Sequence, residues 1–296
     1  MCGIVGLFLK DHTLEPDLGR MTAGMLATLC DRGPDSAGFA VYGEGRTGTT
    51  KLTLRAKTPA EIVIAIDRLV GTFGRLLVTF HDTHAVISVD DDTVPAIAAW
   101  LAGEAPAIDI VGRGHRMELF KEVGSPDKVA ARFGLGAMTG THAIGHTRMA
   151  TESAVTTDGA HPYSTGSDQC LVHNGSLSNH NNLRRNLVRE GFSFETENDT
   201  EVAAGYLSWR MREGMSLGSA LEASLGDVDG FYTFVVGTEN GFGVLRDGIA
   251  CKPAVMAETD RYVAFGSEYR ALAGLPNIAE ARVWEPEPAT VYFWER

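Results

Sequence analysis

The sequence predicts an α+β protein that combines antiparallel-type strands with a few amphipathic helices. Two observations lead to this prediction. The last third of the chain is dense with short apolar runs separated by turn residues, such as 231–236, 242–245 and 262–265, which is typical of strands. Residues 17–31 and 201–212 instead place apolar side chains at helical spacing. Segments of both kinds in one chain indicate a layered arrangement of sheets and helices.

The first elements surround the N-terminus. Residues 3–9 form an apolar run that predicts a short buried strand. The helix predicted over 17–31 ends at Arg32-Gly33-Pro34, because glycine and proline stop helices. Residues 38–42 predict the next strand.

A small subdomain is predicted at residues 50–122, inserted into a main domain that spans 2–296. Thr58 is a candidate N-cap, Pro59 suits the first helical position, and Glu61 completes a capping box. Two helices and five strands are predicted here, with a hairpin turn at Asp82-Thr83. Their order resembles the split βαβ plan. The strands are 51–55, 76–81, 84–89, 108–111 and 117–121, and the helices start at 59 and run over 94–101.

The rest of the chain alternates less regularly. We expect helices at 129–133, 182–190, 201–212 and from Ser216 to 225, and strands at 142–147, 170–173, 254–257, 283–284 and 291–294 in addition to those above. The stretch 162–168 reads as a loop and is a candidate lid.

Composition excludes several classes of protein. The chain has 296 residues, is 44% hydrophobic and carries a net charge of −12, with no basic stripe for nucleic acid. No run approaches the ~18 apolar residues of a membrane span, and the N-terminus lacks the features of a signal peptide. The four cysteines are not spaced as a metal or redox motif. We therefore expect a cytoplasmic protein with no nucleic-acid or membrane partner and no metal.

Cys2 follows the initiator methionine directly. If Met1 is removed, Cys2 carries a free α-amino group, whose reference pKa of about 7.7–8.0 lets it accept a proton near neutral pH. Thiol and base then lie on one residue, as in an N-terminal nucleophile. Position alone favours a terminal cysteine with no role.

Four further segments end predicted strands or helices, where scaffolds present functional groups. Each has a bland alternative: a surface arginine, a plain turn or a helix cap. Together they fit the hydrolysis of glutamine. An Asn side chain and a Gly N–H can stabilise an oxyanion, an Arg fork suits an α-carboxylate, and an Asp suits an α-ammonium. The segments are Arg32-Gly33-Pro34-Asp35-Ser36-Ala37-Gly38, Gly145-His146-Thr147-Arg148-Met149-Ala150-Thr151, His173-Asn174-Gly175 and Asn198-Asp199-Thr200-Glu201.

With Met1-Cys2-Gly3-Ile4, these segments resemble the class II, or N-terminal nucleophile, glutamine amidotransferases in order and over nearly the whole chain. Lys252-Pro253 and Gly266-Ser267-Glu268 also resemble family segments. Two positions differ: Met149 stands where many relatives have an aromatic residue, and Glu152-Ser153 where the sugar-forming branch has His-Gly.

The resemblance implies a four-layer αββα sandwich and assigns roles to individual residues. Cys2 would attack the glutamine amide, Asn174 and Gly175 would form the oxyanion hole, and Arg148 and Asp199 would clamp the amino-acid end. Thr151 would assist the clamp, and Arg32 would organise the surroundings of the nucleophile or bind substrate. We interpret His146, His161 and His173, which match positions in or near the family segments, as structural.

The matched segments run from Cys2 to Glu268, and no GxxxxGK[ST] loop is present, so we expect the synthase on another polypeptide. The chain most resembles the stand-alone glutamine-hydrolysing component of glutamate-synthase-like enzymes, in particular N-methylglutamate synthase. There, flavin and iron–sulfur chemistry belongs to a partner chain, and no cofactor is expected in this one. The 50–122 insertion would either dock that partner or only stabilise the fold. The alternatives are a free-standing glutaminase and a glutamine-binding regulatory module.

Overall fold

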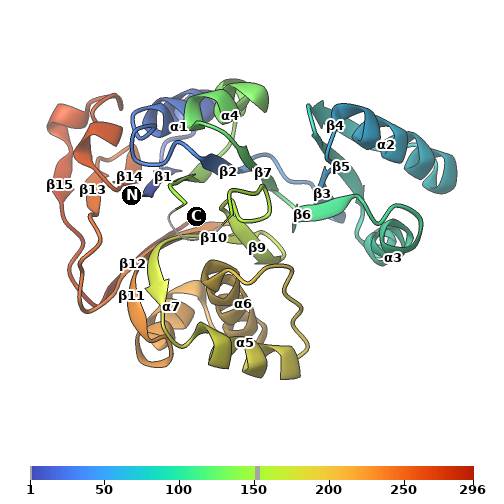
Figure 1. Ribbon diagram of the computed structural model, residues 1–296. Coiled ribbons are helices and arrows are strands. Elements are labelled where there is room, and N and C mark those ends of the chain that lie inside the picture. Colours follow the sequence, from blue (N-terminus) through green and yellow to red (C-terminus); the bar gives the residue numbers. More distant parts are fainter. Residues whose placement is uncertain (1, 151–153) are drawn as a thin grey trace.

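Two stacked antiparallel sheets form the body of the protein, with helices on both outer faces (Figure 1). The structure is a computed structural model that describes residues 2–150 and 154–296. One sheet is covered by α1 (Leu18–Ala27) and α4 (Pro126–Arg132), and the other by α6 (Asp199–Arg212) and α7 (Leu217–Asp227). A further helix, α5 (His180–Arg189), packs against α6. The predicted αββα sandwich is confirmed.

The first sheet places the N-terminal strand at its centre rather than at an edge. Its order is β15-β13-β14-β1-β8-β2-β7, and all neighbours are antiparallel. Because β1 is paired on both sides, the chain enters the fold inside this sheet. The strands are β1 (Gly3–Leu9), β2 (Ser36–Tyr42), β7 (Met117–Val123), β8 (His142–Arg148), β13 (Val255–Glu258), β14 (Tyr262–Gly266) and β15 (Arg282–Trp284).

The second sheet has the order β16-β12-β11-β10-β9 and is also antiparallel. Its strand β10 lies below the middle of the first sheet, where its inward side chains meet those of β1 and β8. The strands are β9 (Tyr163–Gly166), β10 (Gln169–Leu177), β11 (Gly230–Gly237), β12 (Gly241–Arg246) and β16 (Thr290–Glu295).

Alternation of side chains along the strands separates the apolar layers. Ile4, Ile144 and Val172 point between the two sheets, whereas Val5 and Ala143 point to the layer of α1. The closely packed apolar layer between the sheets therefore holds β1, β8 and β10 rigidly, and with them the polar residues at the ends of these strands.

An inserted module projects from one end of the sandwich (Figure 1). Its sheet has the order β4-β5-β3-β6, in which β5 and β3 are central. Thr58 accepts the Glu61 amide, and the Glu61 carboxylate accepts the Thr58 amide, so the predicted capping box is confirmed. The elements are β3 (Thr49–Arg55), α2 (Pro59–Phe73), β4 (Leu77–His81), β5 (His84–Asp90), α3 (Val94–Glu104) and β6 (Asp109–Gly114).

Three sequence-based boundaries were wrong. Strand β7 pairs with β2 along its whole length and so belongs to the first sheet, and the module's sheet ends at Gly114 rather than at 122. The candidate lid at 162–168 is largely β9, an edge strand held by β10. The helix predicted over 17–31 is α1 alone, since its flanks are a 3-10 turn (His12–Asp17) and irregular turns.

Candidate functional site

Cys2 is placed by the central strand that follows it. Gly3 pairs with Thr147 of β8, and a Cβ at Gly3 would lie 2.9 Å from the Thr147 hydroxyl and 3.0 Å from Leu29. Only glycine lets the N-terminus enter this close to β8. The Cys2 thiol forms no disulfide within the described residues and is half-buried, with its sulfur 3.8 Å from the Met149 carbonyl oxygen.

One cavity of about 330 Å³ collects the predicted site residues. They come from the residue before β1, the loop after α1, the end of β8, β10 and the start of α6, so distant parts of the chain meet here. Thr151 and the departure at Glu152-Ser153 lie outside the described residues. The predicted residues that line the cavity are Cys2, Arg32, Arg148, Asn174, Gly175 and Asp199.

Asn174 and Gly175 face Cys2 from the opposite sheet. The Asn174 Nδ2 group donates to the Cys2 carbonyl oxygen and to Ser267 Oγ, at 3.3 Å each. Gly175 has a φ of +143°, and a Cβ there would lie 2.0 Å from the Phe231 carbonyl oxygen. This position therefore requires glycine, which leaves the backbone open beside the thiol.

Arg32 contacts the backbone of the nucleophile candidate. Its Nε donates to the Cys2 carbonyl oxygen at 3.1 Å, and its Nη1 forms an ion pair with Glu268. The Arg32 hydrogen bond lowers the pKa of Glu268, which keeps that carboxylate charged. Arg32 therefore contacts Cys2 through Nε, and another nitrogen of its guanidinium contacts Glu268.

The segment after Arg32 packs against the backbone on either side of Arg148. A Cβ at Gly33 would lie 2.4 Å from the Thr147 carbonyl carbon, so the two chain segments touch. The Asp35 carboxylate accepts the Ala150 amide at 2.8 Å. These contacts hold the backbone on either side of Arg148, whose buried guanidinium reaches the cavity and donates to the Ala154 carbonyl oxygen at 3.3 Å.

Asp199 is the first residue of α6, where the helix dipole favours a negative charge. Its carboxylate accepts the Leu177 amide at 2.9 Å and lies 3.7 Å from His173 Nδ1. Asp199, at the start of α6, and Arg148, at the end of β8, therefore present opposite charges to one cavity.

Two of the three histidines interpreted as structural line this cavity. His161 and His173 both reach the Thr200 hydroxyl, at 2.7 and 2.9 Å. Burial lowers the pKa of His161 well below its usual value and lowers the pKa of His173, so neither is charged near neutral pH. Sequence reasoning also gave no role to Lys252 or Ser267, although both fall in segments that resemble the family.

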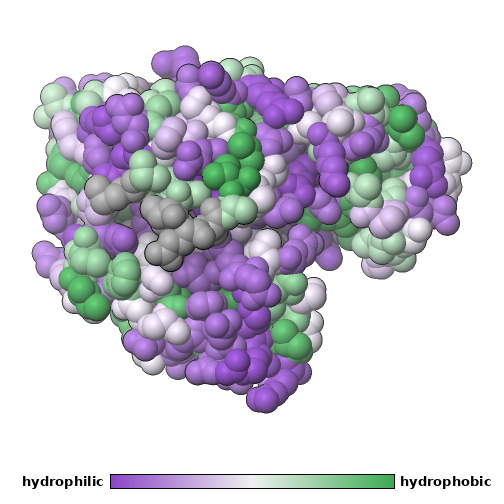
Figure 2. Space-filling model, viewed as in Figure 1, coloured by the Kyte–Doolittle hydropathy of each residue, from purple (hydrophilic) through white to green (hydrophobic). Residues whose placement is uncertain are grey.

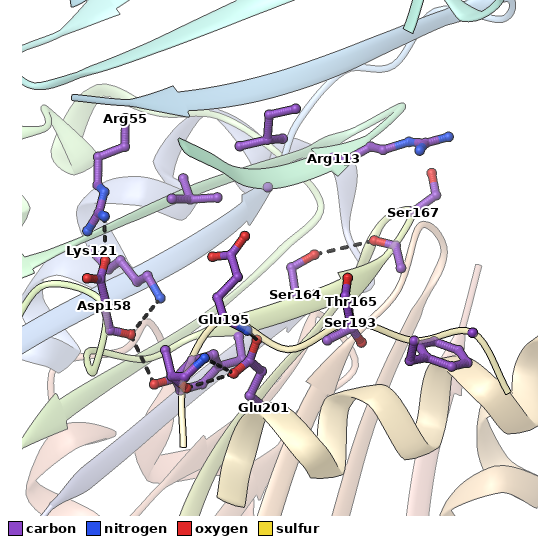
Figure 3. Close-up of a pocket in the computed structure, with 18 of the residues that line it drawn as sticks. Arg55, Arg113, Lys121, Asp158, Ser164, Thr165, Ser167, Ser193, Glu195 and Glu201 are labelled. Carbon is purple, nitrogen blue, oxygen red and sulfur yellow. Dashed lines mark hydrogen bonds and ion pairs between the residues drawn. The ribbon is translucent and has the colours of Figure 1, made fainter. Parts of the chain in front are cut away.

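A larger cavity of about 490 Å³ lies between the inserted module and the second sheet (Figure 3). Several of its charged side chains already have hydrogen-bond or ion-pair partners. Lys121 donates to the Asp158 carbonyl oxygen and covers the Tyr163 ring, Asp158 pairs with Arg55, and Glu201 accepts two backbone amides. Residues of both the module and the body line this cavity. Its described lining residues include no thiol.

Within the described residues, no cluster of three metal-binding side chains is found. The helices of that same part of the chain are all too short or too polar to cross a membrane.

Comparison with known proteins identifies relatives over the whole length of this chain. A family described as glutamine amidotransferase domain matches residues 146–274. The "Glutamine amidotransferase-like protein GlxB" of Rhizobium meliloti is 61% identical over 296 residues, covering 100% of this chain and 98% of that protein. A putative glutamine amidotransferase of Methanothermobacter thermautotrophicus is 33% identical and covers 99% of both chains. The chain belongs to the class II glutamine amidotransferase family.

The amidotransferase also shares its fold with a solved glutamine phosphoribosylpyrophosphate amidotransferase from B. subtilis, with a TM-score of 0.63 at 19% identity. That match covers 99% of this chain but 47% of the other, so this amidotransferase spans about half the length of that protein. As a glutamine amidotransferase, the chain is an enzyme whose substrate is glutamine.

Proposed function

We propose that this amidotransferase is the glutaminase component of a multi-subunit glutamate-synthase-like enzyme, of the N-methylglutamate synthase type. Cys2 would be its nucleophile. The observation that carries the proposal is that Cys2, Asn174-Gly175, Arg148 and Asp199 share one cavity.

The chemistry follows from these positions. Once Met1 is removed, the Cys2 amine takes the thiol proton, and the thiolate attacks the side-chain amide carbon of glutamine. The oxyanion that forms is stabilised by the Asn174 Nδ2 group and the Gly175 N–H. Return of the proton to nitrogen breaks the C–N bond and releases ammonia, leaving a thioester that water hydrolyses to glutamate and free thiol.

The opposite charges of Arg148 and Asp199 would select a free amino acid. The Arg148 fork suits the α-carboxylate, and the Asp199 carboxylate suits the α-ammonium. Asp199 is already oriented by the Leu177 amide, so little is lost in ordering it when glutamine binds. A glutamine residue inside a peptide lacks both charges and is expected to be excluded. Thr151 would assist this clamp.

Arg32 would hold the reacting residue in place. Its hydrogen bond to the Cys2 carbonyl oxygen, backed by Glu268, limits rotation of the N-terminal residue. The nucleophile and its amine then keep one orientation relative to the amide of the substrate.

The synthase partner is proposed from two facts. Two relatives match over 98% and 99% of their own lengths, so these relatives are chains of nearly the same size. The inserted module also offers an unpaired edge, since β4 ends its sheet and exposes Leu77 and Phe80. Figure 2 shows apolar side chains among polar ones on this module. Flavin and iron–sulfur groups would belong to the partner, which would use the ammonia.

An intact Met1 should inactivate the enzyme, because it places the Cys2 amine in a peptide bond. We expect a protein with an uncleaved N-terminal tag to lose at least about 100-fold in kcat for glutamine hydrolysis, the range of general-base catalysis. Ammonia release measures the rate, and mass spectrometry verifies the N-terminus. A C-terminally tagged protein is the control. Full activity of the N-terminal fusion would contradict the role of the amine.

Docking through the inserted module predicts that polar substitutions on β4 weaken binding of the synthase. Leu77→Asp with Phe80→Asp should reduce co-purification of a co-expressed synthase by at least about tenfold, since apolar area at an interface is lost. Glutaminase activity of the isolated chain should not change. Val188→Asp, at an exposed valine on α5, is the matched control. Equal recovery of the partner with both variants would sink the docking proposal.

A variant that lacks the inserted module is a second test of the docking proposal. Gly45 lies against His115, since a Cβ at Gly45 would come 3.2 Å from the His115 carbonyl oxygen. Joining these two residues removes the module's sheet and leaves β7 in the main sheet. A deleted chain that hydrolyses glutamine but still binds the synthase would place the docking surface elsewhere. High turnover of the wild-type chain that no synthase can raise would instead favour a free-standing glutaminase.

A further inference from the structure

We propose that His146 is a positioning residue that sets the orientation of the Asn174 side-chain amide. The proposal rests on the function proposed above, in which Asn174 donates to the oxyanion. His146 does not line the cavity and meets the substrate only through Asn174.

The hydrogen bonds determine which end of the Asn174 amide faces Cys2. One amide atom lies 3.3 Å from the Cys2 carbonyl oxygen, which can only accept, so that atom is the NH₂ group. The other atom, Oδ1, then lies 3.1 Å from His146 Nε2. An amide oxygen only accepts, and His146 must therefore carry its proton on Nε2.

The remaining ring nitrogen agrees with this tautomer. His146 Nδ1 is buried and has no hydrogen-bond partner among the described residues. A bare acceptor without a partner costs less than an orphaned N–H. Burial also lowers the pKa of His146 to about 3, so the ring stays neutral and donates from one nitrogen alone.

The ring is held rigidly enough to act as a fixed donor. His146 is 1% exposed and lies on the inward face of β8, directly across from β10. Its ring packs against that of His161, with centroids 4.1 Å apart, and His161 is tied to the Thr200 hydroxyl. Rotation of the Asn174 amide by 180° would put its oxygen against the Cys2 carbonyl and its NH₂ group against the His146 N–H.

Without this donor, the Asn174 Oδ1 atom loses its partner, and only the hydrogen bonds of Nδ2 to the Cys2 carbonyl oxygen and Ser267 Oγ still favour the present orientation of the amide. Removal of one oxyanion donor typically costs about 10²–10³ in kcat. We therefore expect Asn174→Ala to lose about that factor, and His146→Leu to lose about 10–100-fold in kcat, with KM for glutamine within about threefold of wild type.

Two conservative variants separate positioning from packing. The His146→Gln amide nitrogen reaches about as far as Nε2, so it should restore kcat to within about fivefold of wild type. The His146→Asn side chain reaches only as far as Nδ1 and should not restore it. His142→Leu is the matched control, because His142 is equally buried on the same face of β8 but its Nε2 bonds to the Thr238 carbonyl oxygen, outside the site. Its kcat should stay near wild type.

A double-mutant cycle decides the matter. If His146 acts through Asn174, then His146→Leu added to Asn174→Ala should lower kcat no further. Additive losses, or equal losses from His146→Leu and His142→Leu at equal Tm, would overturn the proposal and leave the function intact. Full activity of Asn174→Ala would overturn both this proposal and the oxyanion role of Asn174.

Discussion

Replacing Cys2 with alanine is expected to abolish glutamine hydrolysis while the protein stays folded. No other thiol is among the described residues that line the cavity, and removal of a nucleophile elsewhere costs several orders of magnitude in kcat. We expect a loss of at least about 10³-fold. The contact of the thiol with the Met149 carbonyl oxygen is long, at 3.8 Å, so the Tm should change little. Ammonia release and thermal unfolding measure the two quantities.

Cys251→Ala is the matched control, since Cys251 is an exposed free thiol outside the cavity. It should retain wild-type activity. An alkylating glutamine analogue should label wild type at Cys2 and leave Cys2→Ala unlabelled. If Cys2→Ala hydrolyses glutamine within tenfold of wild type, the nucleophile is a different group and the proposed mechanism is wrong.

Replacing Arg148 with alanine is expected to weaken glutamine binding more than it slows the chemical step. Arg148 is 7% exposed, so a carboxylate that meets it is largely removed from water. Loss of one partner from such a pair typically costs about 2–4 kcal/mol, which corresponds to about 30–1,000-fold in kcat/KM. Steady-state kinetics with glutamine, and calorimetric binding of glutamine to Cys2→Ala, measure this effect.

Arg148→Lys tests the geometry of the clamp. Lysine keeps the charge but not the planar fork, so part of the loss should remain. Arg113→Ala is the control, because Arg113 lines the larger cavity instead. Unchanged glutamine affinity in Arg148→Ala, with Arg148→Lys and Arg113→Ala equal to it, would remove Arg148 from the clamp.

Local rules were sufficient for much of the secondary structure. The capping box at Thr58 and Glu61, and the Ser216 cap of α7, depend on neighbours a few residues away, and the structure has both. Two of the three errors share one cause. Whether residues 162–168 form a loop or a strand, and whether 117–123 belong to the module or to the main sheet, depends on pairing with strands far along the chain. Single-segment patterns do not contain that information.

The sequence by itself determined the identities of the chemical groups: a thiol at position 2, an Asn-Gly pair, an arginine at a strand end and an acid at a helix start. Their types and order sufficed to propose glutamine hydrolysis. The tertiary structure decided how they meet. Strand β1 enters between β8 and β14, and this pairing brings Cys2 to Asn174, 172 residues away. It also placed His146 behind Asn174, a contact between strands of different sheets. The spacing of apolar residues along the sequence does not predict such a contact, because the contact depends on how two complete sheets stack.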